Sequence, residues 1–133
     1  MYKDVCLIFD VDGTICPIKA EGESYSDLVP NKEMVDKIKG YKKQGAKIVF
    51  FSSRNMKTYN GNLGLINANT APTMLKWLEK WGIPYDEIYF GKPWPGKKGL
   101  YIDDRAVRPD EFLSNTFEEL ESICAKSTRK KEN

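Results

Sequence analysis

Two short apolar runs constrain the fold of this chain more than any other feature of its sequence. The first, residues 5–9, ends at Asp10, and the second, residues 47–51, ends at Ser52. Apolar runs of this length without polar alternation are typical of strands buried on both faces, as in a parallel sheet. Parallel neighbours need a crossover connection, which is usually a helix. The two runs therefore predict parallel strands in an α/β domain.

The segment between the two runs has the pattern of an amphipathic helix. Asn31 can cap its start and Gly45 can end it. Its apolar residues recur at helical spacing and are Met34, Val35, Ile38 and Tyr41. Strand, helix and strand then form a right-handed βαβ unit.

A second helix and two more strands are predicted further along the chain. The helix begins at Asn69 or Thr70, has Pro72 in its first turn and ends at Gly82. Its inward side chains are expected to be Leu75, Leu78 and Trp81. Residues 88–90 and 100–102 are short apolar runs that predict a third and a fourth strand.

The C-terminal part predicts one more helix and then a tail. Thr116 and Glu119 have the spacing of a capping box, and the helix should run to about Ala125. Residues 126–133 lack an apolar pattern and should be disordered. With 133 residues and 41% hydrophobic side chains, the chain fits one α/β domain over residues 1–125.

Charge and hydropathy restrict the classes of partner and the cellular compartment that we expect for the protein. The net charge is only +2, and residues 126–133 carry four basic side chains against one acidic, so nothing implies a nucleic-acid partner. No apolar run reaches the length of a signal-peptide core or a membrane span. The three cysteines form no C-x-x-C pair. We expect a cytoplasmic protein without a membrane partner.

The chain contains no histidine, which restricts its chemistry. Histidine-based catalytic triads, histidine phosphoryl carriers and zinc sites built on imidazole are all excluded. Any bound metal should be a hard cation held by oxygen ligands.

Acidic pairs come after two of the predicted strands. Asp10 and Asp12 lie in the sequence D-V-D-G-T after the first strand, and Asp103 and Asp104 come after the fourth. Carboxylates at parallel strand ends point to Mg²⁺, with a substrate phosphate completing its ligand shell. The alternatives are that Asp12 makes an Asx-turn, that Asp103 caps the next segment of the chain and that Asp104 pairs with a nearby arginine.

Polar residues also come after the second and third strands. Ser52 and Ser53 offer a hydroxyl and turn amides to a phosphate oxygen, and Lys92 offers a positive charge. The alternative is that the serines satisfy the local backbone and that the lysine is merely solvated.

The order Asp-x-Asp, Ser, Lys and Asp-Asp, each directly after a strand, resembles the four motifs of the haloacid dehalogenase superfamily of phosphohydrolases. Further stretches resemble the small bacterial phosphatases of that superfamily that are associated with capsular polysaccharide biosynthesis. These stretches are S-S-R-N-M at residues 52–56, Y-N-G-N at 59–62, G-K-P-W at 91–94 and Y-I-D-D-R-A-V-R-P at 101–109. The resemblance implies a three-layer Rossmann-like domain around a mainly parallel sheet.

The resemblance also implies a role for each motif residue. Asp10 becomes the nucleophile that forms an aspartyl-phosphate, and Asp12 the general acid and base. Mg²⁺ would be bound by Asp10, by the backbone carbonyl of Asp12 and by the final pair, with Asp104 as direct ligand and Asp103 beside it. The phosphoryl group would be held by Ser52, Ser53 and Lys92.

Larger relatives carry a cap domain in one of two slots, and neither slot here is long enough for one. The first, residues 13–30, has room for a hairpin flap only. The open site suits a bulky substrate or a homo-oligomer whose neighbour closes it. A loop after the second strand is expected to bind a small phosphorylated sugar or metabolite, through Arg54, Asn55, Met56 and Tyr59.

Two other functions fit a chain of this size. A phosphatase acting on nucleic-acid 3′-phosphate ends would suit an open site and a basic tail, although the body of the protein is near neutral. A receiver-like signalling module would need a lone acidic residue after the third strand, where this chain has Gly91 and Lys92.

Overall fold

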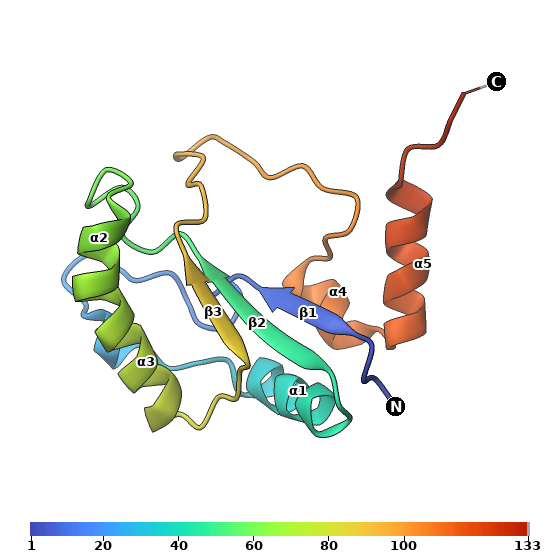
Figure 1. The fold of residues 1–133 in the computed structure, drawn as a ribbon, viewed down its shortest axis with the longest axis horizontal. Helices are drawn as coiled ribbons and strands as arrows, with labels where there is room; N and C mark the ends of the chain where they lie inside the picture. The colour runs from blue at the N-terminus through green and yellow to red at the C-terminus, as the bar shows by residue number, and fades with distance from the viewer. Residues whose placement is uncertain (133) are drawn as a thin grey trace. The chain divides into compact units, whose positions relative to one another are not determined.

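A computed structural model describes residues 1–132, and the chain divides into two compact units, Met1–Trp94 and Pro95–Asn133. The first unit contains a parallel three-stranded sheet with helices, and the second is helical (Figure 1). The predicted α/β class with a parallel sheet is therefore confirmed. That one domain spans residues 1–125 stays a prediction.

The sheet has the order β1-β2-β3, with β1 at Cys6–Phe9, β2 at Lys47–Ser52 and β3 at Glu87–Phe90. Both pairings are parallel, as predicted for the two apolar runs. Phe9 lies opposite Phe50, and Ser52 lies opposite Phe90. The residues directly after the three strands consequently share one edge of the sheet.

Helix α1 (Lys32–Lys43) connects β1 to β2 and forms for the predicted reasons. The Asn31 side chain accepts a hydrogen bond from the Met34 amide at 2.8 Å. All four predicted inward residues of this helix are buried. Gly45 has a φ of +97°, a conformation that glycine adopts without the strain of a side chain, and it turns the chain into β2.

The helical segment before β3 begins earlier than predicted. Three consecutive pieces, α2 (Leu63–Leu65), the π-helical turn η2 (Ile66–Thr70) and α3 (Ala71–Lys80), succeed one another without a break. The Asn62 side chain accepts from the Leu65 amide at 3.1 Å and caps the segment. Helix α3 itself begins directly after Thr70 with Pro72 in its first turn, as predicted. The Thr70 side chain makes no capping hydrogen bond, because the turn before α3 already supplies the backbone acceptors.

The inward face of α3 is also rotated from the prediction. Leu78 is fully buried, whereas Leu75 is 39% exposed and Trp81 is half-buried. Met74 and Trp77 are buried instead, and Trp77 Nε1 donates to the Leu28 carbonyl at 2.7 Å. One residue along a helix turns the face by about 100°. The spacing of apolar residues alone therefore does not decide which of the neighbouring side chains of α3 face the core.

Burial on both faces holds for β2 but not for β1. Ile48, Val49 and Phe50 are all buried, because β2 lies in the middle of the sheet. On β1, Phe9 is buried whereas Ile8 is 65% exposed. Successive right-handed crossovers in one direction place α1 and α3 on the same face of the sheet, which leaves the Ile8 face of β1 without their cover.

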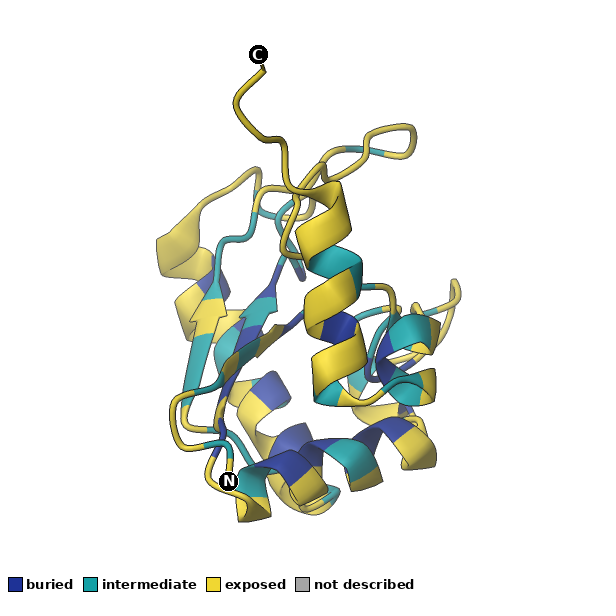
Figure 2. Cartoon of the chain, turned by 90° about the vertical axis from the view of Figure 1, so that its right-hand side faces the viewer, coloured by how far each residue is buried: buried dark blue, intermediate teal, exposed yellow. Residues whose placement is uncertain are grey.

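The second unit contains helices α4 (Pro109–Ser114) and α5 (Phe117–Ser127). The predicted capping box at Thr116 and Glu119 is confirmed, since the Glu119 amide donates to Thr116 Oγ1 at 3.2 Å and the Thr116 amide to Glu119 Oε1 at 2.8 Å. The helix α5 ends two residues beyond the predicted end. Residues 128–132 are exposed, as Figure 2 shows for the segment leading to the C-terminus.

The predicted fourth strand at residues 100–102 is absent from the structure. Leu100 and Ile102 are 78% and 93% exposed, and no described residue of the second unit forms a strand beside them. A strand needs a partner for its backbone amides and carbonyls, which an apolar run by itself does not provide. Across residues 1–132, no helix combines the length and the apolar character required to cross a membrane.

Candidate active site

Three of the predicted site residues meet at the carboxyl edge of the sheet. Asp10 comes after β1, Ser52 ends β2 and Lys92 comes after β3. Lys92 Nζ lies 3.4 Å from Asp10 Oδ1, and the Lys92 amide donates to the Ser52 carbonyl at 3.1 Å. Open α/β sheets bind ligands at this edge, so the geometry agrees with the expected position of a site.

The Asp10 carboxylate is held in place but remains open to solvent. Thr14 Oγ1 donates to Asp10 Oδ2 at 3.1 Å, and Lys92 faces the other oxygen. Gly13 has a φ of +91°, and this turn brings Thr14 back towards the strand end. The Asp10 side chain is 32% exposed, which leaves it accessible to a ligand.

The serine after β2 has a structural task as well as a predicted one. Ser52 is 1% exposed, and its Oγ accepts the amide of Arg54 at 3.0 Å. This is the backbone role considered as the alternative for the serines. The hydroxyl can still donate one hydrogen bond. Ser53 is half-buried beside it, and binding of phosphate by Ser52 and Ser53 stays a prediction.

Asp12 is engaged by Arg54 in a two-pronged ion pair. Arg54 Nε lies 3.0 Å from Asp12 Oδ2, and Arg54 Nη2 lies 2.8 Å from Asp12 Oδ1. Parallel charge-assisted bonds of this kind are strong and orient both planes. The Arg54 side chain is only 1% exposed, against 22% for Asp12. Substrate binding by Arg54 stays a prediction, and the structure gives this guanidinium a protein partner.

Tyr25 lies beneath the guanidinium of Arg54. It belongs to the short 3₁₀ helix η1 (Tyr25–Asp27) in the loop between β1 and α1. The Arg54 Cζ atom is 4.1 Å from the centre of the Tyr25 ring, within the range of a cation–π contact. Burial, together with the negative charge of Asp12, raises the pKa of the Tyr25 hydroxyl. The tyrosine is therefore neutral at physiological pH.

Cys16 also contacts the Asp12 carboxylate. Its Sγ lies 3.6 Å from Asp12 Oδ1, and the residue is 3% exposed. Burial and then the Asp12 carboxylate raise the pKa of this thiol to about 12. A thiol that remains protonated at neutral pH is a poor nucleophile.

The predicted substrate loop after Arg54 forms a compact turn. Asn55 has a φ of +62°, and its Oδ1 accepts from Thr70 Oγ1 at 2.7 Å, which ties the loop to the helical segment. Met56 and Tyr59 are half-buried in this turn. Substrate binding by Asn55, Met56 and Tyr59 stays a prediction.

An exposed indole lies next to this loop. Trp94 is 43% exposed, and Lys57 Nζ lies 5.6 Å from the centre of its ring. Part of the Trp94 ring is therefore open to solvent beside the loop.

The second acidic pair belongs to the second unit and has local partners there. Asp103 Oδ1 accepts the Arg105 amide at 2.8 Å, which agrees with the alternative that Asp103 caps the next segment of the chain. Asp104 Oδ2 accepts from Thr128 Oγ1 at 2.7 Å. Metal binding by Asp103 and Asp104 stays a prediction.

The oxygen donors of the first unit suit a hard cation. Both carboxylate oxygens of Asp12 accept from Arg54, and metal binding by its backbone carbonyl stays a prediction. Asp10 supplies an accessible carboxylate. Within residues 1–132, no three acidic or cysteine side chains form one cluster. Mg²⁺ binding at this edge stays a prediction, which a sparse set of oxygen ligands allows because Mg²⁺ keeps waters and takes ligands from a bound phosphate.

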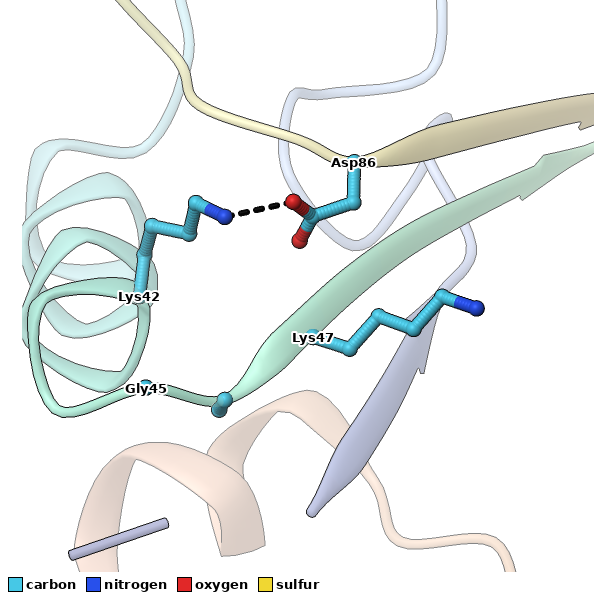
Figure 3. A pocket seen from close by; sticks show the side chains of 5 residues that line it. Lys42, Gly45, Lys47 and Asp86 are labelled. Carbon is cyan, nitrogen blue, oxygen red and sulfur yellow. Dashed lines mark hydrogen bonds and ion pairs between the residues drawn. The ribbon is translucent and has the colours of Figure 1, made fainter. Parts of the chain in front are cut away.

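A polar pocket at the opposite end of the sheet is structural (Figure 3). Asp86 pairs with Lys42 and also accepts the Ile48 amide at 2.8 Å, and these two interactions, the pair with Lys42 first, lower the pKa of its carboxyl group. Gly45, Ala46 and Lys47 complete the lining. Asp86 thus joins α1, β2 and the start of β3, and its interactions are satisfied within the protein.

The Asp86→Asn variant should lower the melting temperature at neutral pH. The carboxylate is more acidic when folded, so its stabilisation is present above the unfolded pKa of about 4 and is lost as the pH falls below it. Thermal unfolding at several pH values should show the gap to the wild type closing below about pH 4. Asp36→Asn, in an exposed i,i+4 pair with Lys32, is the matched control and should have a smaller effect. A gap that does not change with pH would contradict the assigned cause.

The sequence did not reveal two neighbours of the acidic pair. Thr14 stands in the D-V-D-G-T motif, and its position four residues after Asp10 could have suggested the contact once a turn was assumed. Tyr25 lies in an irregular loop and carries no motif, so only the folded chain shows its place beneath Arg54.

Comparison with solved structures finds a likeness that extends over most of this chain. No protein-family model and no curated protein matches the chain. The crystal structure of an MCSG target protein from Vibrio cholerae matches it with 43% sequence identity and a TM-score of 0.87, covering 93% of this chain and 99% of that chain.

Two chains from structures of the Pnkp1/Rnl/Hen1 complex, one described as an RNA repair complex, are also similar. Their sequence identities are 20% and 23%, and their TM-scores are 0.47 and 0.48. The matches cover 71% and 83% of this chain, but only 27% and 33% of those chains.

Proposed function

This chain belongs to one family with the Vibrio cholerae target protein, and we propose that it is a Mg²⁺-dependent phosphomonoester hydrolase of the haloacid dehalogenase type. The reaction would proceed through an aspartyl-phosphate on Asp10. The substrate would bind at the open carboxyl edge of the sheet.

The observation that carries the proposal is the setting of the Asp10 carboxylate. It lies at the carboxyl edge of a parallel sheet, 32% exposed, with Lys92 Nζ at 3.4 Å and Thr14 Oγ1 at 3.1 Å. A carboxylate nucleophile must meet an anionic phosphate, and a nearby ammonium group reduces the repulsion between them. The buried Ser52 adjoins Lys92 through a backbone hydrogen bond.

Asp10 and Asp12 carry out different parts of the proposed reaction. An Asp10 oxygen attacks phosphorus, the bond from phosphorus to the ester oxygen breaks, and Asp12 gives its proton to the leaving oxygen. Asp12 then takes a proton from water, whose oxygen attacks phosphorus and releases phosphate from Asp10. Ser52, Ser53 and Lys92 would hold the phosphoryl oxygens throughout.

A Mg²⁺ ion would be held by Asp10, by the Asp12 backbone carbonyl and by Asp104, with Asp103 supporting the last of these. When bound, the ion supplies positive charge that offsets the repulsion between nucleophile and phosphate.

The substrate class proposed is a phosphorylated sugar or other small metabolite of capsular polysaccharide biosynthesis. Two features support an open site that accepts a bulky group. In the described chain between β1 and α1 the only helical element is η1, and between β2 and β3 the chain forms α2, η2 and α3 without a separate domain. The exposed Trp94 ring beside Lys57 offers an apolar face to such a substrate.

Phosphate release from a panel of esters tests the proposed function. With Mg²⁺ present we expect turnover of sugar phosphates, and a chelator in excess should remove it until Mg²⁺ is added back. Zn²⁺ should be a poor substitute, because the proposed metal ligands are all oxygen atoms. Full activity in excess chelator would contradict the metal requirement, and turnover confined to oligonucleotide 3′-phosphates would replace the sugar assignment.

A further inference from the structure

We propose that Arg54 is a positioning residue, which holds Asp12 in the orientation needed for proton transfer while Tyr25 supports its guanidinium. We call these three side chains the clamp. The inference rests on the proposed function, because it gives Asp12 a task in phosphoryl transfer. It differs from the sequence-based expectation that Arg54 binds substrate.

The geometry of the ion pair is the first support for the clamp. Arg54 Nε and Nη2 bind different oxygens of Asp12, at 3.0 Å and 2.8 Å. A single contact would let the carboxylate rotate, whereas two parallel contacts fix its plane. Asp12 gives a proton in one step and takes one in the next, and each transfer needs its oxygen to point at the reacting oxygen.

The two partners of this ion pair differ in their exposure to solvent. The Arg54 side chain is 1% exposed and the Asp12 side chain 22% exposed. Arg54 could meet a substrate only by leaving its buried position, whereas Asp12 is already accessible. Arg54 is therefore placed to orient the Asp12 carboxylate and not to contact a substrate.

The third nitrogen of Arg54 gives independent support. Nη1 is buried and has no hydrogen-bond partner within residues 1–132. A buried N–H group without a partner is unfavourable, so an arginine that only filled space here would be worse than an apolar side chain. The two hydrogen bonds to Asp12 explain why the guanidinium occupies this position.

Tyr25 completes the clamp from a different part of the chain. Its ring lies 4.1 Å from Arg54 Cζ, and it is contributed by the loop between β1 and α1. The flat face of the ring restricts the guanidinium to one plane. A change in Tyr25 should consequently reach Asp12 through Arg54.

Kinetics on two ester types test the clamp. Arg54→Lys keeps the positive charge but cannot make the two parallel hydrogen bonds to Asp12. The kcat on an alkyl phosphate should therefore fall by about 10- to 100-fold, within the range of acid–base catalysis. Aryl phosphates leave without a proton, so their kcat and the KM for both esters should change little. Tyr25→Leu should shift the ratio of the two rates the same way, and Tyr25→Phe should keep the wild-type ratio. Arg129→Lys, the same exchange at an exposed ion pair, is the control.

A second readout does not depend on activity. The Arg54 Nε–H should give a slowly exchanging NMR signal that is absent in Arg54→Lys and exchanges faster in Asp12→Ala and Tyr25→Leu. Thermal unfolding identifies folded variants, and Tyr25→Leu carries the kinetic test if Arg54→Lys does not fold.

Three outcomes decide between the proposals. Equal losses on both ester types with a raised KM in Arg54→Lys would overturn the clamp and make Arg54 a substrate-binding residue. A protected Nε–H signal that Asp12→Ala leaves unchanged would also overturn it, whatever the activity. No phosphate release by the wild type, with the signal behaving as expected, would overturn the proposed function and support the clamp as a feature of the site.

Discussion

Asp10→Asn is expected to abolish phosphate release while leaving the fold intact. The amide has the size of the carboxylate but cannot attack phosphorus to form an acyl-phosphate. The amide oxygen can still accept from Thr14, whose hydroxyl lies 3.1 Å from Asp10 Oδ2, so the strand end should keep its shape. Phosphate release and thermal unfolding of the variant measure the two expectations separately.

The control for this variant is Asp36→Asn, an exchange of the same atoms on the exposed surface of α1. It should leave phosphate release unchanged. Labelled phosphate should be trapped on Asp10 of the wild type and be absent from Asp10→Asn. Label on a different residue, or more than a trace of activity in Asp10→Asn, would show that Asp10 is not the nucleophile.

Asp12→Asn should slow esters with alcohol leaving groups far more than aryl phosphates. Loss of the general acid should lower the rate on alkyl esters by about 10²- to 10⁴-fold, whereas aryl leaving groups depart without a proton. The phosphoenzyme should persist, because water then lacks its base. An amide oxygen at this position can still accept one hydrogen bond from Arg54, so the variant should fold.

The same variant distinguishes the role of the Asp12 side chain from that of its backbone carbonyl. The carbonyl is the proposed metal ligand, so Mg²⁺ affinity, measured by titration calorimetry, should barely change. Asp104→Asn is the matched comparison and should weaken Mg²⁺ binding, since its side chain is the proposed ligand. Equal losses on both ester types together with weak Mg²⁺ binding in Asp12→Asn would assign the Asp12 side chain to the metal instead.

Local rules were sufficient for the elements whose signals lie close together in the chain. The cap at Asn31, the buried face of α1 and the capping box at Thr116 each depend on residues within one or two helical turns, and the structure confirms all three. The same rules failed at α3, where adjacent apolar residues allowed more than one inward face. They failed again at residues 100–102, because an apolar run does not specify its own pairing partner.

The candidate site was predicted in part for a topological reason. Parallel strands end at one edge, so the polar residues after β1, β2 and β3 had to approach one another once the strands were correct. The contact between Asp10 and Lys92, which are 82 residues apart, agrees with this argument. The roles of these residues remain predictions, which phosphate release by the Asp10 and Asp12 variants tests.

By itself, the sequence determined the α/β class, the parallel order of the apolar runs and the polar residues at the strand ends, because these depend on hydrophobic pattern and backbone propensity along the chain. Only the tertiary structure decided which partner each polar group has. Arg54 and Asp12 are 42 residues apart, and Tyr25 comes from a loop without a motif. Such contacts depend on the distance and burial of side chains from separate segments, which the order of residues does not specify.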